Sequence, residues 1–397
     1  MAEKRHIILV WELGGGLGHL ARLQTLALPL LDLGHKVTVV SRNIENARKV
    51  FTDPDLDIRQ APLWHNQWPK NHQAISNAEI LLLIGYADPN KLRNVLSQWL
   101  TLFSDLDPDL IIADYAPTAL CAAKISAVPA ISMGNGFEIP HKDVPVPSLQ
   151  PWVKIPRTKL VSCEQRVLTN INSIFADQAC RPIDAFYQLF RGDDNLLCTL
   201  KELDHFGGKH DITYRGVDEQ GITGDLPDWP NSTGAKIFVY LPASHFQLVV
   251  LTQAVRKLKL PSIFYIRNLP ARAKELMEGE HLTVTDTPVN LPKIAAQADL
   301  VISHGGHGTS ATALLAGSRL LTLPTNLEQR LLSYRLAQQG LITTSLNNRT
   351  FKAEIAINVA LGNPLVSENA GRFAEAYRAR TTKDASAELM GVVSEYL

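Results

Sequence analysis

Apolar residues along the chain alternate between short runs typical of buried strands and longer stretches with helical spacing. His6–Trp11 is a β-rich apolar run, His19–Leu33 carries leucines and alanines at helical spacing, and Lys36–Ser41 is a second strand-like run. Gly34 ends the helical stretch. This order predicts a unit of strand, helix and strand.

The same cycle returns further along the chain. It recurs with strands at Asp109–Ala113 and Pro129–Met133 around a helix at Ala116–Ser126. In the second half, a helix at Gln247–Leu258 accompanies predicted strands at Ile237–Leu241, Ser262–Ile266, Leu300–Ser303 and Leu320–Pro324. The pattern predicts an α/β protein with two Rossmann-like, doubly wound parallel sheets.

The periodicity breaks between Gly207 and Gly234, where Gly, Asp, Pro and Thr dominate. The predicted parts are an N-terminal domain at 1–215, a linker at 216–235, a C-terminal domain at 236–366 and a helical tail at 367–397 that can pack back on the N-terminal domain. Each half has a glycine loop after a strand, which makes a cleft between the domains the expected site.

Composition narrows the class of protein. The 397 residues are 45% hydrophobic and 20% charged, with 39 basic and 39 acidic side chains, as in a globular protein without the electrostatic footprint of nucleic-acid binding. The four cysteines form no CxxC pair, so reduced thiols are expected. No apolar run reaches the ~20 residues of a membrane-spanning helix, and Ile7–Trp11 is too short for a signal peptide. We expect a soluble, cytoplasmic protein with small-molecule partners; no pattern indicates its oligomeric state.

The most specific chemical signal is Ser303–Ser310, which reads SHGGHGTS between a predicted strand and a short helix. Glycines let the backbone approach a ligand, and the N–H groups at a helix start favour an anion such as a diphosphate. The residues expected to bind it are His304, Gly305, Gly306, Gly308, Thr309 and Ser310. A tight turn with incidental histidines is the alternative.

Polar residues also follow the predicted strands of the N-terminal half. His19 comes directly after the glycine loop Gly14–Gly18, and Asp114 follows a strand, where open α/β sheets place site residues. The alternative for Asp114 is a helix N-cap. Glu12 is a rival base or acceptor contact, or else a solvated charge at a strand end. As a dinucleotide motif the loop is weak, because no acidic residue closes the second strand.

The segment Ala298–Gly340 resembles the donor-binding signature of the UDP-glycosyltransferase and macrolide glycosyltransferase superfamily, which has the GT-B fold. The matched residues are His304, Gly305, Gly306, Gly308, Thr309, Gly317, Pro324, Glu328 and Gln329. In the N-terminal half, Gly16-Leu17-Gly18-His19 is similar to the family's GxGH opening, and Pro108–Pro117 is similar to its Asp-bearing strand. Together these segments span most of the chain.

The resemblance implies an inverting, metal-independent transfer of a sugar from a nucleotide diphosphate sugar, probably a UDP-sugar, to a hydroxyl of an apolar or amphipathic acceptor. Glu328 and Gln329 would hold the donor sugar, with capping of a helix start as their alternative role. His19 is predicted to be the base and Asp114 the carboxylate that orients it. No metal and no cofactor besides the nucleotide sugar are expected. Acceptor-side candidates are Glu12, Gly16, Gly18, Trp64 and Trp68, with Leu81–Tyr86 and Asn135–His141 as further walls.

The chain departs from the family pattern at three positions. Thr312 stands where a ribose-binding glutamate is common, Val289 replaces a base-contacting glutamine, and Arg22 replaces a frequent proline. Two other functions are therefore carried alongside transfer. One is a non-catalytic activator or binding protein, which would bind no nucleotide. The other is a nucleotide-sugar epimerase, which would need paired carboxylates in its cleft.

Overall fold

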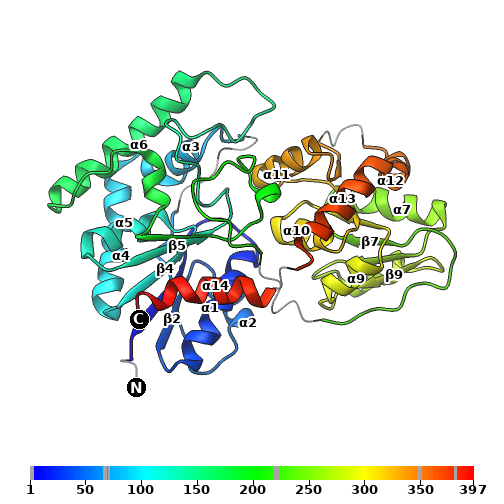
Figure 1. The fold of residues 1–397 in the computed structure, drawn as a ribbon, viewed down its shortest axis with the longest axis horizontal. Helices are drawn as coiled ribbons and strands as arrows, with labels where there is room; N and C mark the ends of the chain where they lie inside the picture. Colours follow the sequence, from blue (N-terminus) through cyan, green and yellow to red (C-terminus); the bar gives the residue numbers. More distant parts are fainter. Residues whose placement is uncertain (1–3, 66–68, 70–71, 218–223, 347–350, 380–381) are drawn as a thin grey trace. The chain divides into compact units, whose positions relative to one another are not determined.

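The computed structural model describes residues 4–65, 69, 72–217, 224–346, 351–379 and 382–397 (Figure 1). The chain forms two compact units. Unit 1 consists of Met1–Asp218 and Thr382–Leu397, and unit 2 of Glu219–Thr381. Each unit has one six-stranded sheet in which neighbouring strands are parallel. The predicted α/β class with two doubly wound sheets is confirmed.

Unit 1 alternates strands and helices as expected for a doubly wound sheet. Its strands are β1 (His6–Trp11), β2 (Lys36–Ser41), β3 (Asp57–Gln60), β4 (Leu110–Asp114), β5 (Ala130–Gly134) and β6 (Asp194–Leu197). Its helices are α1 (Gly18–Asp32), α2 (Ile44–Val50), α3 (Asn77–Leu81), α4 (Pro89–Leu106), α5 (Pro117–Ser126), α6 (Arg157–Asp177) and α14 (Thr382–Ser394), with short helical turns η1 (Leu82–Tyr86), η2 (Phe186–Phe190) and η3 (Lys201–Leu203).

The strand order of unit 1 is β3-β2-β1-β4-β5-β6, so the direction of winding reverses between β1 and β4. At that reversal Trp11 is paired with Asp114 at the carboxyl ends of the two strands. Ligands of open α/β sheets bind outside the carboxyl ends at such a switch point. The residues after β1 and at the end of β4 are therefore brought to the position where a site is expected.

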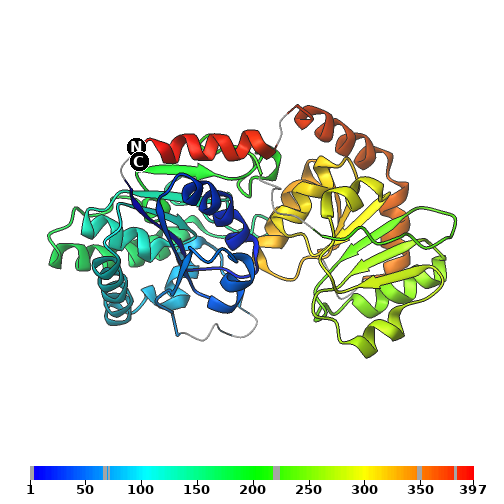
Figure 2. The same ribbon diagram turned by 90° about the horizontal axis from the view of Figure 1, so that it is seen from below.

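The C-terminal helix α14 belongs to unit 1, where it lies against α1 (Figure 1). Leu389 and Val393 are buried in the same apolar core as Leu20 and Leu23 of α1. Tyr396 donates a hydrogen bond of 2.9 Å to Asp194 at the start of β6, beside which α14 (red) lies in Figure 2. The expected single tail at 367–397 is thus two helices with different partners, because α13 packs on α10 in unit 2.

Unit 2 repeats the architecture with its own core. Its strands are β7 (Ile237–Tyr240), β8 (Ser262–Tyr265), β9 (Leu282–Thr285), β10 (Leu300–Ser303), β11 (Arg319–Thr322) and β12 (Thr343–Thr344). Its helices are α7 (Leu248–Leu258), α8 (Ala271–Met277), α9 (Leu291–Gln297), α10 (His307–Leu315), α11 (Leu327–Gln338), α12 (Ala353–Gly362) and α13 (Pro364–Tyr377).

The sheet of unit 2 runs β12-β11-β10-β7-β8-β9 and reverses between β10 and β7. Ser303 and Tyr240 are paired at the carboxyl ends of these two strands. The glycine loop that follows Ser303 therefore starts at the switch point of unit 2. Strand β11 ends at Thr322, two residues before its predicted end at Pro324, a residue that has no N–H to donate to a strand ladder.

No helix in the described ranges is both long enough and apolar enough to cross a membrane.

Candidate active site

His19 and Asp114 are in direct contact in unit 1. His19 lies in the first turn of α1, and its Nδ1 is 2.7 Å from Oδ1 of Asp114. The rings of Trp11 and Tyr115 stack with the imidazole, with centroids 5.2 and 6.2 Å away. Because a carboxylate only accepts hydrogen bonds, Nδ1 carries the proton and the neutral ring presents the lone pair of Nε2.

The surrounding charges favour the protonated form of His19. Burial alone would lower the pKa of His19, but the carboxylates of Asp114 and Glu138 outweigh burial and raise that pKa above 6.5. Oε1 of Glu138 is 3.4 Å from Nδ1. His19 is therefore a stronger base than an exposed histidine.

Two further charged residues, which the sequence analysis did not assign to catalysis, complete this cluster. Arg22 lies three residues after His19 on α1 and donates hydrogen bonds to Asp114 Oδ2 at 2.9 Å and to Glu138 Oε2 at 2.6 Å. Glu138 follows β5, and the N–H of Asn135 donates to it at 2.6 Å. From the sequence, Arg22 was only a departure from a family pattern, and Glu138 lay inside an expected acceptor wall. A charge on the same helical face as His19 was the available signal for Arg22.

His19, Asp114 and Glu138 also offer three potential metal ligands, whose atoms lie within 4.8 Å of one another. The guanidinium of Arg22 bonds to both carboxylates and supplies positive charge between them. The fixed cation of this cluster is therefore a side chain.

Nε2 of His19 faces the backbone of Gly14 in the glycine loop. Gly14 has φ +84°, and a Cβ placed on it would lie 2.5 Å from Nε2. The loop thus needs glycine here both for its backbone conformation and for the space that the imidazole occupies.

Replacing Gly14 with alanine is expected to reduce transfer at least tenfold, because the new Cβ must displace the imidazole that Asp114 orients. Steady-state kinetics with an identified acceptor measures the loss. Gly34→Ala is the matched control, since Gly34 has φ +88° but open space around its Cβ position. Equal losses in both variants would assign the effect to backbone strain and contradict the prediction.

Glu12 is a buried structural carboxylate, so its interpretation as a solvated charge is wrong. It is 2% exposed and accepts from the N–H of Thr118 at 2.9 Å and from the indole of Trp64 at 2.9 Å. Burial raises its pKa above the ordinary value. Glu12 thereby provides the negative charge at the start of α5.

The N-cap interpretation of Asp114 is also wrong. The N-cap of α5 is Ala116, which makes no side-chain cap, and the Asp114 carboxylate bonds to His19 and Arg22 instead.

The other acceptor-side candidates are distributed around the same edge of unit 1. Gly16 and Gly18 are exposed, with open space at their Cβ positions. The half-buried Trp64 contacts Tyr86, with ring centroids 5.3 Å apart. Trp68 lies outside the described residues. The roles of these residues in acceptor binding stay predictions.

In unit 2 the glycine loop is closely packed on one side and uncapped on the other. Gly305 has φ +78°, and a Cβ there would lie 2.7 Å from Oγ of Ser333 on α11. Gly306 is the N-cap of α10 and makes no side-chain cap, and the first turn of that helix contains no acidic residue. The first N–H groups of α10, which have no intrahelical acceptor, are thus available to an anion.

Buried polar atoms beside this loop also lack partners among the described residues. They are Nδ1 of His304, Oγ of Ser310 and Oγ of Ser333. Burial lowers the pKa of His304 below 6.5, so its ring is neutral at pH 7 and offers a hydrogen bond. Unpaired buried polar groups are costly and are usually satisfied by a ligand or water.

Glu328 and Gln329 lie at the start of α11. Gln329 forms a capping box: its N–H donates to Asn326 at 2.9 Å, and its Oε1 accepts from the N–H of Thr325 at 3.0 Å. The alternative role of Gln329 as a capping residue is therefore present in the structure. Glu328 is close enough to His304 for its charge to raise the pKa of that ring. Sugar binding by either residue stays a prediction.

Arg267, which the sequence analysis did not single out, is a basic residue of this region. It follows β8, donates a hydrogen bond of 3.0 Å to the hydroxyl of Tyr240, and its charge acts on His304. The ring of Tyr240 contacts the ring of His304 edge-on at 5.8 Å. The carboxyl ends of β7, β8 and β10 therefore place an arginine, a tyrosine and a histidine together. An arginine directly after a predicted strand was the available signal.

Comparison with known proteins defines the class. No protein-family model matches the chain. The chain is 24% identical over 380 residues to the PGL/p-HBAD biosynthesis glycosyltransferase of Mycobacterium tuberculosis (strain ATCC 25177 / H37Ra), covering 85% of this chain and 84% of the relative. It is also 24% identical over 370 residues to the zeaxanthin glucosyltransferase of Pseudescherichia vulneris, covering 85% of this chain and 86% of the relative.

Solved structures agree with these relatives on the fold. The calicheamicin glycosyltransferase CalG4 matches with a TM-score of 0.69 at 16% identity, over 100% of this chain and 98% of its own. The spinosyn rhamnosyltransferase SpnG, complexed with thymidine diphosphate, matches with a TM-score of 0.67 at 15% identity, over 98% of this chain and 100% of its own. The predicted resemblance, the GT-B fold and the enzyme class, a glycosyltransferase, are confirmed.

Proposed function

We propose that the protein is an inverting, metal-independent glycosyltransferase that moves a sugar from a nucleotide diphosphate sugar to a hydroxyl of an apolar or amphipathic acceptor. The contact of 2.7 Å between His19 and Asp114 carries this proposal. It gives unit 1 a buried, oriented base. The uncapped start of α10 gives unit 2 an anion site of the kind that a diphosphate requires.

On the acceptor side, His19 acts as general base. A hydroxyl is a poor nucleophile at neutral pH, so its oxygen attacks the anomeric carbon more readily as Nε2 takes the proton. Asp114 holds the tautomer and stabilises the imidazolium that forms. The aromatic side chains beside the dyad supply apolar surface for the rest of the acceptor.

On the donor side, the loop His304–Ser310 binds the diphosphate. Charge develops on the leaving phosphate oxygen as the bond to the anomeric carbon breaks, and preoriented N–H groups stabilise that charge. Glu328 and Gln329 hold hydroxyls of the sugar. A single displacement, with the acceptor attacking opposite the leaving group, inverts the anomeric carbon.

The reaction needs no metal in this proposal. The amides and dipole of α10, with Arg267 close to His304, supply the positive potential that a divalent cation supplies elsewhere. Transfer is therefore expected to proceed at an unchanged rate after dialysis against EDTA. Activity that is lost on chelation and restored by Mg²⁺ or Mn²⁺ would contradict metal independence.

The donor base is proposed as a pyrimidine. The UDP-glycosyltransferase resemblance supports uridine, and the thymidine diphosphate complex of SpnG supports thymidine. The names of the two curated relatives, which refer to zeaxanthin and to PGL/p-HBAD biosynthesis, support an apolar acceptor.

The epimerase alternative has one feature in its favour, since Asp114 and Glu138 form a pair of carboxylates. Both, however, accept hydrogen bonds from Arg22, at 2.9 and 2.6 Å, which stabilises their ionised forms. A carboxylate held in this way is a poor proton donor. Transfer is therefore favoured over epimerisation.

Calorimetric titration of the purified protein with UDP, dTDP, GDP and ADP tests the donor side. Binding of UDP or dTDP in preference to the purine nucleotides is expected. Incubation with the matching nucleotide sugar and hydrophobic alcohols, followed by mass spectrometry, then tests transfer. Binding of no nucleotide would favour the activator or binding protein, and conversion of the donor to an isomer without an acceptor would favour the epimerase.

A further inference from the structure

Four ionisable side chains meet in one buried cluster at the switch point of unit 1. The side chains of His19, Arg22 and Glu138 are 9%, 13% and 7% exposed, and that of Asp114 is fully buried. Arg22 bonds to both carboxylates, and the His19 imidazole contacts both as well. Solvent screens these charges little, so each charge acts on the others.

The formal charges show what each member does. Two carboxylates and one guanidinium leave a net charge of −1 around a neutral His19. Protonation of His19 brings the cluster to zero. Without Glu138 the same step would take the cluster from zero to +1, which a buried site disfavours.

We propose that Glu138 is a positioning residue that compensates the positive charge of Arg22, so that Asp114 and Glu138 together orient His19 and stabilise its protonated form during transfer. The inference rests on the proposed role of His19 as base. It also accounts for the departure at Arg22, because a cation one turn from the base would oppose protonation unless a second carboxylate offset it.

The local backbone is built to bring Glu138 back toward β5. A Cβ on Gly134, the last residue of β5, would lie 2.8 Å from the Cβ of Glu138, so only glycine leaves room there. The N–H of Asn135 donates to Oε2, which also accepts from Arg22. These contacts fix the carboxylate and lower the pKa of Glu138 to about 2: burial opposes ionisation, but Arg22 and His19 outweigh it.

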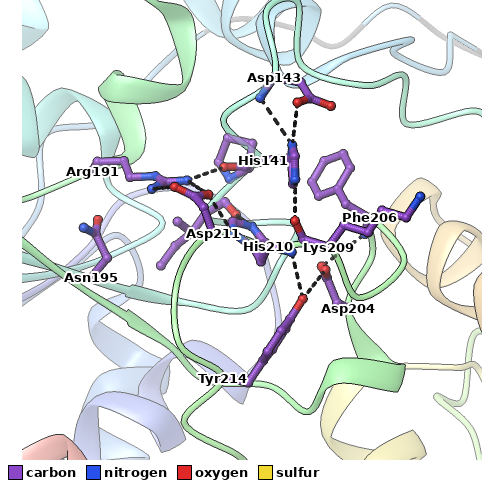
Figure 3. A network of polar contacts seen from close by, with 12 residues as sticks. His141, Asp143, Arg191, Asn195, Asp204, Phe206, Lys209, His210, Asp211 and Tyr214 are labelled. Carbon is purple, nitrogen blue, oxygen red and sulfur yellow. Dashed lines mark hydrogen bonds and ion pairs between the residues drawn. The ribbon is translucent and has the colours of Figure 1, made fainter.

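The segment that carries Glu138 is held by a second polar network (Figure 3). His210 contacts the carbonyl of Ile139 at 2.8 Å through Nε2, and Arg191 donates to the carbonyl of Pro140 at 3.3 Å while pairing with Asp211. His141 contacts the carbonyl of Lys209 at 2.6 Å. Residues 139–141 are therefore attached to residues 209–211 along their length.

Asp204 fixes the base of that network. Its carboxylate accepts from the N–H of Phe206 at 3.1 Å and from the Tyr214 hydroxyl at 2.9 Å (Figure 3). A Cβ on Gly136 would lie 2.1 Å from Oδ1 of Asp204, so the loop runs directly over this carboxylate. Such support holds a side chain in one geometry, as a positioning role requires.

Other ionisable groups near the cluster leave the charge count unchanged. Burial raises the pKa of the Cys198 thiol, which faces Arg22, to about 12, so this thiol is neutral. Tyr115 presents its ring face to His19. Arg42 donates to the carbonyl of Gly14 at 2.8 Å and is an exposed contact, so solvent screens its charge. Glu12 faces the start of α5.

Histidine-selective ¹³C NMR titration of the ligand-free protein tests the inference without an activity assay. Glu138→Gln is expected to lower the pKa of His19 by about 1 to 3, the usual effect of removing a nearby opposite charge. The acid limb of the kcat/KM profile is expected to move to lower pH by the same amount, because the neutral base is then present at lower pH. Comparison with His19→Ala assigns the resonance.

The rescue variant separates charge from structure. Arg22→Met/Glu138→Gln restores a net charge of −1 with Asp114 alone, and the pKa of His19 is expected to return toward its wild-type value. Glu164→Gln is the matched control: Glu164 is a buried carboxylate on α6 that accepts from Val146, and its loss should leave the His19 titration unchanged. If Glu138→Gln does not fold, Arg22→Met should instead raise the pKa of His19.

An unchanged His19 pKa in Glu138→Gln, or a further fall in the double variant, would overturn the inference. The outcome is independent of the proposed function. If the NMR shifts occur but His19→Ala retains transfer, the charge pair stands and the base assignment fails. If His19→Ala loses transfer but the shifts are absent, the base assignment stands and the charge pair fails.

Discussion

Replacing His19 with alanine is expected to reduce sugar transfer by about 10²–10⁴-fold, the usual contribution of a positioned general base. Alanine removes the only group of the Asp114 dyad that can accept the acceptor proton, whereas the proposed diphosphate site lies in unit 2. The affinity for UDP or dTDP should therefore stay at its wild-type value. Turnover with an identified acceptor and calorimetry with the nucleotide measure the two effects separately.

Asp114→Asn should be impaired to a similar degree, because asparagine can present a donor to Nδ1 and so allow the wrong tautomer. The matched control is His35→Ala. His35 is a buried histidine of unit 1 directly before β2, at the opposite edge of the sheet from the dyad, and its Nδ1 accepts from Arg5. Near wild-type turnover in a folded His19→Ala protein would show that another group is the base or that the acceptor needs none.

Replacing Gly306 with valine is expected to weaken nucleotide binding by roughly 10–100-fold, since charge-assisted hydrogen bonds contribute ~1.5–3 kcal/mol. Gly306 is the N-cap of α10, and a Cβ there lies 3.0 Å from Nε2 of His304. A branched side chain at this position blocks the approach of a phosphate to the helix amides. Calorimetry with the preferred nucleotide measures the loss.

The backbone of Gly306 makes this test specific. Its φ of −65° and ψ of 146° are angles that valine adopts without strain, so the variant should fold. Gly371→Ala is the control, because Gly371 is a helical glycine of unit 2 with open space at its Cβ position, and alanine there should leave affinity unchanged. Unchanged affinity in Gly306→Val would mean that the loop is only a turn and that the donor binds elsewhere.

The hydrophobic pattern predicted most of the sheet scaffold. The runs at His6–Trp11, Lys36–Ser41 and Leu300–Ser303 are strands with the predicted bounds, because buried parallel strands need continuous apolar residues. Polar residues directly after such runs then pointed to His19, Asp114 and His304. This worked because the carboxyl ends of parallel strands share one edge of the sheet.

The pattern failed where a side chain's partner is distant in the chain. Glu12 looked like a charge at a strand end, yet its partners are Trp64 and the start of α5. The tail looked like one segment, yet α13 and α14 pack on different units, because helical spacing identifies an apolar face without naming what covers it.

The sequence by itself determined the two α/β halves, the glycine loops and the residues that follow the strands, since these depend on local spacing and on backbone conformations that glycine allows. Only the tertiary structure decided that Arg22 and Glu138 join His19 and Asp114. The contacts of Arg22 with Asp114 and Glu138 span 92 and 116 residues. Such contacts arise from the strand order β1-β4-β5, which brings α1 and the ends of β4 and β5 together and which no local pattern records.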